Sequence, residues 1–503
     1  MKYILALLVI VLLALLIVFR ATHHVKPVTA EQFMKKYSRE KVKDVRFGVN
    51  RLAQGFEQDI ASSGAGWISM SPVVLWAAVQ PNRDTYRWDQ VDEAIRKIQT
   101  AGLEPTITLM PVSSWATPEA FNELVQGKLK FCDYPDDEEG RLAWAQFVEA
   151  LVERYDGDGV GDMPGLKGAV LNWHVVEEWP TFWYDRAGQS PTDTSNAERY
   201  VALLKATYTA IKREIPEANV IVTGLASTPT RLLAYAEGYI DDPDAGVYRS
   251  MQYSRDDILR NPRFKRFKAE VEYILREGCK YFDAVDMHLQ DEKLSFTEGK
   301  IKWLKDTMAR LGCSKLILAV ESGGPFKRLS GDNTSQCGDS YFGGFTEKEN
   351  AEFVVKMHVL AYATGLERFQ WSWTPGSGST WDGPFLLMPL RDSEGNPKPA
   401  YYTYVMLQYF MNGFTGIEEL NTGRSVRLFK ISLPKGEVYV AWSDEGAATL
   451  DLSRYISGKV VVHRIVTETD RNHNPVTKLG IEASSSSIEV TETPIFIVKV
   501  GAH

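Results

Sequence analysis

Short apolar runs alternate with segments of helical periodicity through most of the chain. Eight apolar runs have the length of buried strands, at residues 45–50, 67–71, 104–110, 169–176, 219–223, 282–288, 315–321 and 367–373. Helical periods lie between or after them, at residues 88–101, 141–155, 196–215, 300–311, 346–364 and 399–411. Strands that alternate with helices build a parallel sheet, and eight such strands can close into a barrel. The pattern therefore predicts an α/β fold, a (β/α)8 TIM barrel over residues 45–412.

The pattern of hydrophobic and polar residues changes after Gly413. Strands of alternating polarity follow at residues 424–433, 437–442, 459–466 and 495–500, and Gly, Asn and Ser turns separate them. Helical periodicity is absent from this stretch, which favours an all-β unit. We therefore expect a C-terminal β-sandwich domain over residues 413–503, packed on the barrel.

The amino-terminal segment differs from both of these units. Residues 3–19 are apolar without a break, and Arg20 and Lys26 follow them. This run is at the short end of membrane spans and is longer than the apolar core of most signal peptides. No small-residue cleavage site follows closely, so residues 1–20 predict a retained single-pass signal anchor rather than a cleaved signal peptide, with a linker over residues 21–44. Either interpretation places the barrel outside the cytoplasm, membrane-anchored or secreted.

Composition and charge exclude several classes of protein. With 503 residues, 44% hydrophobic and 24% charged, the chain is neither disordered nor of low complexity. A net charge of -8 argues against nucleic-acid binding, which needs a basic surface. The cysteines show no metal-ligand spacing. Cys279 and Cys313 each follow a glycine at the end of a helical stretch, and both a disulfide and buried free thiols remain open for them.

Glutamates stand at the ends of two predicted strands. Strand four ends at Glu177 and Glu178, and strand seven ends at Glu321. In a barrel these two strands face each other, and the catalytic residues of such barrels lie at the carboxyl ends of the strands. Two carboxylates ~5–5.5 Å apart are what a retaining glycosidase uses, one as nucleophile and one as acid/base. The alternative is that strand-end glutamates cap loops or bind a cation, but the opposed pair favours a sugar-handling site.

These segments resemble, in chain order, the clan A retaining glycoside hydrolases, and within that clan family 39. The matching motifs are WAAVQP at 76–81 with YRWD at 86–89, PVSSWA at 111–116, WHVVEE at 173–178, DMH at 286–288, VESGGP at 320–325 and QWSW at 370–373. The resemblance implies that Glu178 is the acid/base and Glu321 the nucleophile, with no cofactor required for catalysis. It also implies that the Trp371 ring forms the base of a sugar-binding subsite. His288 would contact the substrate or a catalytic carboxylate, and a structural role is the alternative for this residue.

Other tryptophans near strand ends are candidates for substrate binding. Trp76 and Trp115 could line subsites because the CH faces of sugars stack on indole rings. The alternative for each is packing between a loop and the barrel. Trp371 is the preferred candidate because it lies on strand eight, which we expect to face the pocket.

Three positions depart from the pattern of the clan. Glu177 stands where the clan has an Asn that bonds the sugar 2-hydroxyl, and a carboxylate can only accept hydrogen bonds unless it is protonated. Ser69 lies where an Arg is common, and Gln290 lies where a Tyr is expected. An ionised Glu177 should raise the Glu178 pKa. These departures predict an altered substrate, with Glu177 among the substrate-binding residues, or a site that binds sugar without cutting it.

An acidic loop before strand four is a candidate metal site. Asp156, Asp158 and Asp162 alternate with glycines, as in the first half of an EF-hand loop, but the bidentate Glu of that motif is missing. A structural Ca2+ would stabilise this loop without taking part in catalysis. A solvated polar turn is the alternative.

The sequence thus predicts a glycoside hydrolase that cleaves β-glycosidic bonds in an oligo- or polysaccharide by double displacement. Its partners would be the carbohydrate substrate and, through the amino-terminal segment, the membrane. A non-catalytic carbohydrate-binding protein on the same barrel is the first alternative. A transglycosylase or a polysaccharide-processing partner of an export machine is the second. The separation of Glu178 and Glu321 and their access to solvent distinguish the hydrolase from the binding protein.

Overall fold

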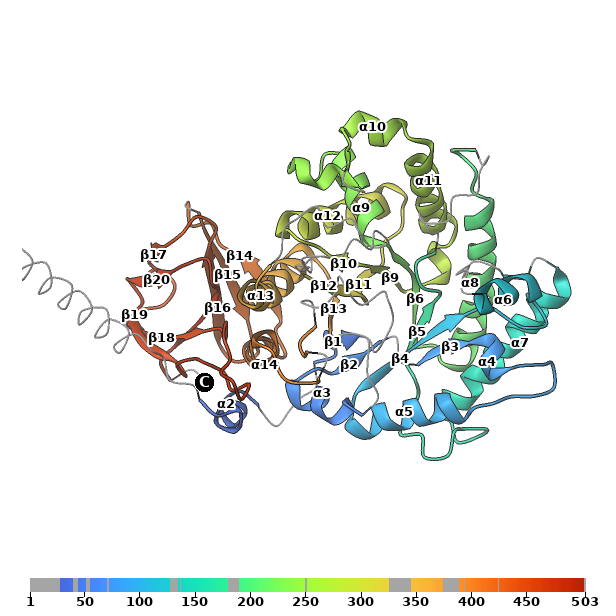
Figure 1. Cartoon of the computed structure of the whole chain (residues 1–503), viewed down its shortest axis with the longest axis horizontal. Coiled ribbons are helices and arrows are strands. Elements are labelled where there is room, and N and C mark those ends of the chain that lie inside the picture. The colour runs from blue at the N-terminus through green and yellow to red at the C-terminus, as the bar shows by residue number, and fades with distance from the viewer. Residues whose placement is uncertain are drawn as a thin grey trace, which may run out of the picture.

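The computed structural model shows a barrel with a smaller sheet domain beside it (Figure 1). It describes residues 28–38, 44–50, 55–69, 72–126, 134–135, 137–179, 190–248, 251–324, 345–373, 389–392, 394–423 and 425–501. The predicted anchor over residues 1–20 lies outside these residues. None of the helices in the described part of the chain combines the length and the apolar composition needed to cross a membrane.

A parallel sheet of nine strands closes on itself to form the barrel. The closed ring runs through β1 (Phe47–Asn50), β2 (Trp67–Ile68), β4 (Glu104–Met110), β5 (Asn172–Val175), β6 (Asn219–Leu225), β9 (Ala284–Met287), β11 (Leu316–Ala319) and β13 (Arg368–Ser372). β13 pairs with β1, which completes the ring. The ninth strand, β3 (Val73–Leu75), continues the path of β2 alongside β4. Each of the eight predicted strands overlaps one strand of the ring, so the predicted barrel is confirmed.

Helices form the outer layer of the barrel. They are α3 (Glu57–Ser63), α4 (Trp76–Val79), α5 (Asp89–Ala101), α6 (Pro118–Val125), α7 (Glu138–Tyr155), α8 (Ser195–Glu214), α9 (Ser227–Ala236), α10 (Arg255–Arg260), α11 (Pro262–Glu277), α12 (Leu294–Arg310), α13 (Glu347–Thr364) and α14 (Pro399–Met411). Helix α13 shows why the boundaries lie where they do. Thr346 and Glu349 form a capping box at its start, and Gly365 ends it in the left-handed conformation with φ 111°. Helices α9 to α11 lie in a stretch for which the sequence predicted no elements.

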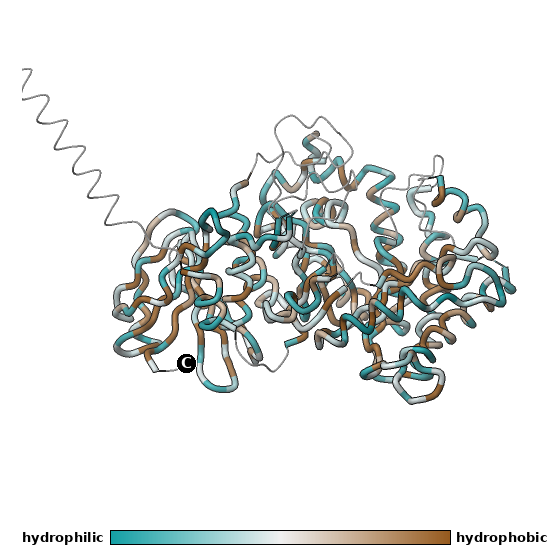
Figure 2. The backbone as a smooth tube through the Cα atoms, turned by 60° about the horizontal axis from the view of Figure 1, so that its bottom comes forward, coloured by the Kyte–Doolittle hydropathy of each residue, from teal (hydrophilic) through white to brown (hydrophobic). Residues whose placement is uncertain are grey.

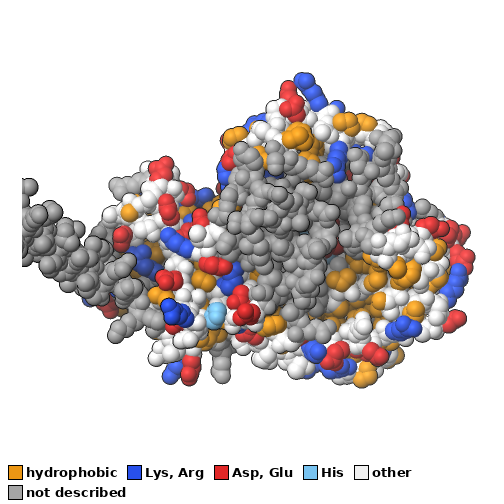
Figure 3. Space-filling view, viewed as in Figure 1, with side chains coloured by type: hydrophobic (Ala, Val, Ile, Leu, Met, Phe, Trp, Pro, Cys, Tyr) orange, Lys and Arg blue, Asp and Glu red, His pale blue; other side chains and the backbone are white. Residues whose placement is uncertain are grey.

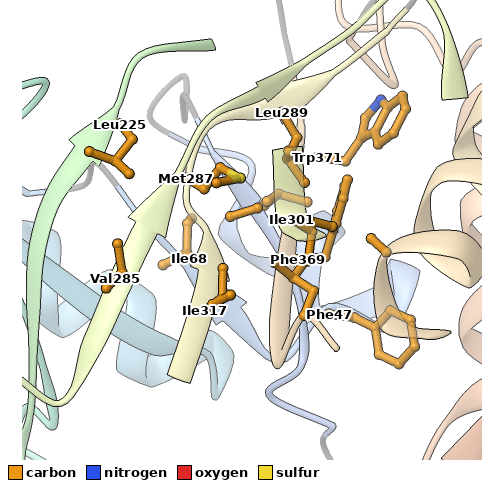
Figure 4. Packing of buried hydrophobic residues seen from close by; sticks show 14 of the residues in the cluster. Phe47, Ile68, Leu225, Val285, Met287, Leu289, Ile301, Ile317, Phe369 and Trp371 are labelled. Carbon is orange, nitrogen blue, oxygen red and sulfur yellow. The ribbon is translucent and has the colours of Figure 1, made fainter. Parts of the chain in front are cut away.

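The strands of the barrel carry hydrophobic side chains toward the surrounding helices. Phe369 and Trp371 of β13 are fully buried among such side chains, together with Phe47 of β1 (Figure 4). Hydrophobic and hydrophilic stretches alternate along the described backbone of both the barrel and the sheet domain (Figure 2). The alternate positions of β13, Gln370 and Ser372, are polar and belong to the opposite face of the strand.

The C-terminal domain is an antiparallel sheet of six strands, in the order β14-β15-β16-β21-β18-β19. These strands are β14 (Gly416–Glu419), β15 (Val426–Ser432), β16 (Glu437–Ser443), β18 (Lys459–Arg464), β19 (Ile481–Ser484) and β21 (Ile495–Lys499). A separate pair, β17 (Ala448–Leu450) and β20 (Ile488–Val490), lies beside it. A separate all-β domain is thus confirmed, and charged side chains of both signs are interspersed over its described surface (Figure 3).

Both faces of the central strands of this sheet are buried. On β16, Val440 and Trp442 belong to the same hydrophobic core as the barrel, whereas Ala441 belongs to a second cluster that includes residues of β17 and β20. The first face contacts α14 directly, because Phe410 of α14 stacks on Phe496 of β21 with ring centroids 4.6 Å apart. The sheet and the barrel therefore share one core.

A short helix lies within the segment that was predicted to be a linker. Helix α2 (Ala30–Tyr37) begins with a capping box at Thr29. Phe33 packs edge-on against Tyr402 of α14 at 5.1 Å, and the Tyr37 hydroxyl lies 2.9 Å from Nδ1 of His463 in β18. Phe33 and Tyr37 are buried, so this part of the segment is a structural element rather than a linker.

A disulfide joins Cys279 and Cys313, whose Cα atoms are 5.8 Å apart. Cys279 lies in the short helix η2 (Cys279–Tyr281) that precedes β9, and Cys313 lies between α12 and β11. This finding decides between the two open alternatives for these cysteines. Disulfides persist in oxidising compartments and are rare in the cytosol.

Candidate active site

The candidate site lies where β5, β9 and β11 end at the carboxyl side of the barrel. Glu177 and Glu178 follow β5, His288 follows β9, and Glu321 follows β11. The structure brings all four side chains together, as the positions of the strand ends predicted. The imidazole of His288 is fully buried at their centre.

Each ring nitrogen of His288 faces two carboxylates. Nδ1 lies 2.9 Å from Oε1 of Glu178, with which it forms a hydrogen bond, and 3.9 Å from Oε2 of Glu321. Nε2 lies 2.8 Å from Oε1 of Glu177 and 3.2 Å from Oδ2 of Asp286. Because Glu178 and Glu321 approach the same nitrogen, their carboxylates lie close together across the barrel.

The backbone after β5 explains how two consecutive glutamates reach one imidazole. Successive side chains of a strand point to opposite sides. Here Val176 and Glu178 adopt the left-handed conformation, with φ 67° and 46°, which redirects the chain around Glu177. Such a conformation is unusual for a β-branched residue and costs about 1–3 kcal/mol, so the surrounding structure must enforce it. Tyr200 helps, because its hydroxyl donates to the Val175 carbonyl at 2.7 Å.

The backbone before Glu321 is fixed from several strands. The Val320 carbonyl accepts hydrogen bonds from Nδ2 of Asn50 at 3.0 Å and from Oγ of Ser69 at 3.2 Å. The Val320 amide donates to Oδ1 of Asp286 at 2.8 Å. Ser69 thus supports the backbone beside Glu321 at the position where the clan commonly has an Arg.

The carboxylate of Glu321 is held by Gln290, which stands where a Tyr was expected. Nε2 of Gln290 donates to Oε1 of Glu321 at 2.6 Å. The amide therefore supplies a donor in place of the expected hydroxyl. The Glu321 side chain is 9% exposed and that of Glu178 is 29% exposed, so Glu178 is the more accessible of the two.

Burial and charge shift the pKa values of the central groups. Burial raises the pKa of Glu178, and the negative charges of Glu321 and Glu177 act in the same direction, while the hydrogen bond from His288 opposes them. Burial lowers the pKa of His288, but the carboxylates of Glu177 and Asp286 outweigh it and hold the pKa well above the usual 6.5. The surroundings therefore raise the pKa values of both groups, Glu178 through burial and like charge and His288 through its carboxylate neighbours.

Glu177 was predicted to bind substrate, but the structure turns it inward. Both of its carboxylate oxygens are buried. Oε1 contacts His288, and Oε2 lies 3.6 Å from Nδ1 of His174, a fully buried residue of β5. The negative charge of Glu177 therefore acts on histidines inside the barrel rather than on the open face of the site.

Two of the three tryptophans predicted to bind substrate are packing residues instead. Trp371 is fully buried and stacks on His358 of α13, with ring centroids 5.5 Å apart, on the face of β13 that packs against helices (Figure 4). Trp76 is also fully buried and stacks on Phe147 of α7 at 5.6 Å. Trp115 is half-buried against Trp76, so it alone of the three retains exposed surface.

His174 and Asp286 received no role from the sequence, although they complete the buried cluster. Nε2 of His174 lies 3.4 Å from Oδ2 of Asp286, and both side chains are fully buried. The sequence pattern could have indicated this cluster. Polar residues stand at alternate positions of an otherwise apolar run, at Asp286, His288 and Gln290. Alternate positions of a strand share one face.

The acidic loop lies at the other end of the barrel, before β5 begins. The side chains of Asp156, Asp158 and Asp162 bring carboxylate oxygens within 4.8 Å of one another. Asp162 also accepts hydrogen bonds from the amides of Gly157 at 3.0 Å and Gly159 at 2.8 Å, so the loop partly satisfies its own carboxylates. These oxygens suit Ca2+, and the structural calcium remains a prediction.

Gly224 of β6 makes room for the central imidazole. A Cβ at this position would lie 2.2 Å from Nε2 of His288 and 2.8 Å from Oδ2 of Asp286.

We expect Gly224→Ala to displace the imidazole and to lower the free energy of unfolding by about 1–3 kcal/mol, as overpacking of a core does. Chemical denaturation measures this change. Gly416→Ala is the matched control, because a Cβ there meets no atom within 4 Å. Equal destabilisation by the two variants would contradict the role of Gly224.

Comparison with known proteins supports the fold. The sequence matches no protein-family model and no curated protein. Among solved structures, a family 39 glycoside hydrolase from the gut symbiont Bacteroides cellulosilyticus WH2 is similar, with a TM-score of 0.58 and 14% identity over 91% of this chain and 81% of that chain. A glucosidase from Croceicoccus marinus is similar with a TM-score of 0.53 and 12% identity over 93% of this chain and 98% of that chain. The predicted resemblance to family 39 is thereby confirmed at the level of the fold.

Proposed function

We propose that this protein is a retaining glycoside hydrolase that cleaves β-glycosidic bonds in an oligo- or polysaccharide. Glu178 serves as the acid/base and Glu321 as the nucleophile. The observation that carries the proposal is the pair of carboxylates on opposed strands, which both approach Nδ1 of His288, at 2.9 and 3.9 Å. Closely spaced carboxylates are the requirement for retention of configuration, whereas inverting enzymes keep them ~6.5–9.5 Å apart.

The reaction follows from the two positions. Glu178 donates its proton to the glycosidic oxygen while a carboxylate oxygen of Glu321 attacks the anomeric carbon, and the bond to the leaving group breaks. Water then attacks the anomeric carbon of the glycosyl-enzyme, gives a proton to Glu178 and releases Glu321.

The assignment of the two roles rests on their surroundings. Burial and neighbouring negative charge raise the pKa of Glu178, which suits a group that must carry a proton before the bond breaks. Glu178 is also the more exposed of the two side chains. Glu321 accepts a hydrogen bond from Gln290, which fixes its orientation for attack.

A covalent trap tests the proposal. A panel of aryl β-glycosides and polysaccharides first identifies a substrate, and the matching 2-deoxy-2-fluoro glycoside with a good leaving group then forms a slowly hydrolysed ester. We expect mass spectrometry of the digested protein to find the sugar on Glu321. A folded protein that binds polysaccharide, hydrolyses none of the panel and takes up no label would instead be a carbohydrate-binding protein.

We also propose that the barrel is exported, either anchored through residues 1–20 or secreted. The Cys279–Cys313 disulfide and the apolar run at residues 3–19 support export. We expect the full-length protein to fractionate with membranes. Val28 should be the latest start for a soluble form that keeps its fold, because α2 packs on the sheet domain. A mature amino terminus near Glu31 would show a cleaved signal instead and would contradict the anchor.

A further inference from the structure

We propose that Glu177 and Asp286 hold His288 as an imidazolium that exchanges a proton with Glu178, so that these residues form a proton relay behind the acid/base. The relay rests on the proposed function, since it gives His288 a role in the chemistry of Glu178. His288 is a positioning residue in this scheme, because it acts on the substrate only through Glu178.

The arrangement around the imidazole favours a proton on each ring nitrogen. Glu177 and Asp286 both face Nε2, at 2.8 and 3.2 Å, so Nε2 must carry a proton to compensate them. Glu178 faces Nδ1 at hydrogen-bond distance, 2.9 Å. Neutral imidazole carries one N–H, whereas the imidazolium carries a proton on both nitrogens and a positive charge that balances the carboxylates on both sides.

The charges around His288 favour the imidazolium. Among the residues that the structure describes, six titratable groups face it from the elements packed against it: Glu177, Glu178 and His174 after or on β5, Asp286 on β9, Glu321 after β11, and Lys300 of α12. Lys300 donates to the His288 carbonyl at 3.0 Å, but its charge is paired with Asp291 at 2.8 Å. β6 presents Gly224, which has no side chain. A buried cluster so rich in carboxylates needs a cation, and an uncompensated buried charge is costly.

The relay keeps negative charge from accumulating on Glu178. In the first step, the proton on Oε2 of Glu178 goes to the glycosidic oxygen as the Nδ1 proton of His288 goes to Oε1. Glu178 stays neutral and His288 becomes a neutral imidazole that keeps its Nε2 proton. In the second step, the proton from the attacking water goes to Oε2 and the Oε1 proton returns to Nδ1, which restores both groups.

The same arrangement explains the most distinct departure in the sequence. At the position before the acid/base, an Asn could not compensate a positive charge, whereas Glu177 can. Its carboxylate is directed to His288 and His174, both fully buried, and not to the surface. The substitution therefore provides an internal counter-ion for the histidine.

Nuclear magnetic resonance of the full-length protein with 15N-labelled histidines tests the relay directly, because the chain has only 8 histidines. We expect both ring nitrogens of His288 to be protonated at pH 7.5, where an ordinary imidazole with a pKa of ~6.5 is mostly neutral. His358 is an internal reference, since burial lowers its pKa to about 3 and keeps it neutral. A neutral His288 at pH 7.5 would overturn the proposal.

The variants Glu177→Gln and Asp286→Asn separate the relay from a merely structural cluster. Each removes a negative charge that stabilises the imidazolium, so His288 should lose its proton at a lower pH. The alkaline limb of the kcat/KM profile should move to lower pH by roughly one unit or more. Glu418→Gln, an exposed position on β14, is the matched control and should leave the limb in place.

The outcomes distinguish the relay from the proposed function. If the wild-type protein cleaves no glycoside, the proposed function fails, while the protonation of His288 is still decided by resonance. If the protein is active and folded variants at both positions keep the wild-type alkaline limb, the relay is wrong and the hydrolase remains. Two independent positions guard against one variant that fails to fold.

Discussion

Replacing Glu321 by Gln is expected to reduce turnover by roughly 10⁴–10⁶-fold while the fold is retained, because an amide oxygen cannot form the covalent intermediate. The substitution preserves the shape of the side chain, and an amide oxygen can still accept the hydrogen bond from Gln290. Steady-state hydrolysis of the substrate found in the glycoside panel measures the loss. Because the side chain is almost buried, we expect KM to change far less than kcat.

Glu418→Gln again provides the control, since it makes the same chemical change at an exposed position outside the barrel. Its activity should equal that of the wild type. Circular dichroism and the midpoint of thermal unfolding should show that Glu321→Gln is folded. Wild-type turnover in a folded Glu321→Gln variant would exclude this residue as the nucleophile.

Replacing Glu178 by Ala should slow the protein according to the leaving group of the substrate. Glycosides whose leaving group needs protonation should lose about 10²–10⁴-fold in kcat/KM, because the proposed proton donor is gone. In glycosides of acidic phenols, the phenolate leaves without needing a proton. These substrates should therefore retain rapid formation of the glycosyl-enzyme. Added azide should then accelerate turnover, since it attacks the anomeric carbon without needing a base, and the product should be a β-glycosyl azide.

The two parts of this result have different meanings. A loss that is the same for all leaving groups would show that Glu178 orients substrate instead of donating a proton. Failure of azide to rescue, with an accumulated glycosyl-enzyme present, would mean that the space vacated by the Glu178 side chain does not admit the anion. Glu177→Ala is the internal comparison, because it removes the neighbouring carboxylate and should not create a site for rescue by azide.

Strand positions, and the polar residues that stand at the strand ends, could be predicted from the sequence because both depend on local patterns. Each barrel strand is a short apolar run, and a polar residue follows where it reaches the mouth. Glu178 and Glu321 were therefore found from their places at the ends of strands four and seven. The shorter strands of the C-terminal sheet, such as β14, were missed because their side chains are largely exposed and carry no apolar run.

The orientation of side chains within a strand was harder to predict. Trp371 was assigned to the pocket because its strand reaches the site, but its neighbours Gln370 and Ser372 take the other face. A shift of one residue exchanges the two faces of a strand, so the position of a strand does not determine which residues it presents. The polar neighbours in an apolar strand were the signal for the correct parity.

The sequence indicates the start of α2, but it does not indicate the backbone conformation after β5. The capping box of α2 is readable, because Thr29 and Gln32 have the spacing of that motif, although the amphipathic turn after it was assigned to a linker. The left-handed conformations of Val176 and Glu178 could not be read, because neither residue favours them. They are imposed by tertiary contacts around the end of β5, which no local pattern reports.

The shared core of barrel and sheet bears on how this architecture can be recombined. Carbohydrate-processing proteins with accessory domains on free linkers are modular, and such domains can be exchanged as cassettes. Here Phe410 of α14 is packed against Phe496 of the sheet, and α2 adds Tyr37 at the same junction. Exchanging the sheet domain would expose apolar side chains of α14, the last helix of the barrel, to solvent. The barrel, the sheet domain and α2 are therefore one packing unit, and a sheet domain could be exchanged only together with the α14 and α2 side chains that contact it.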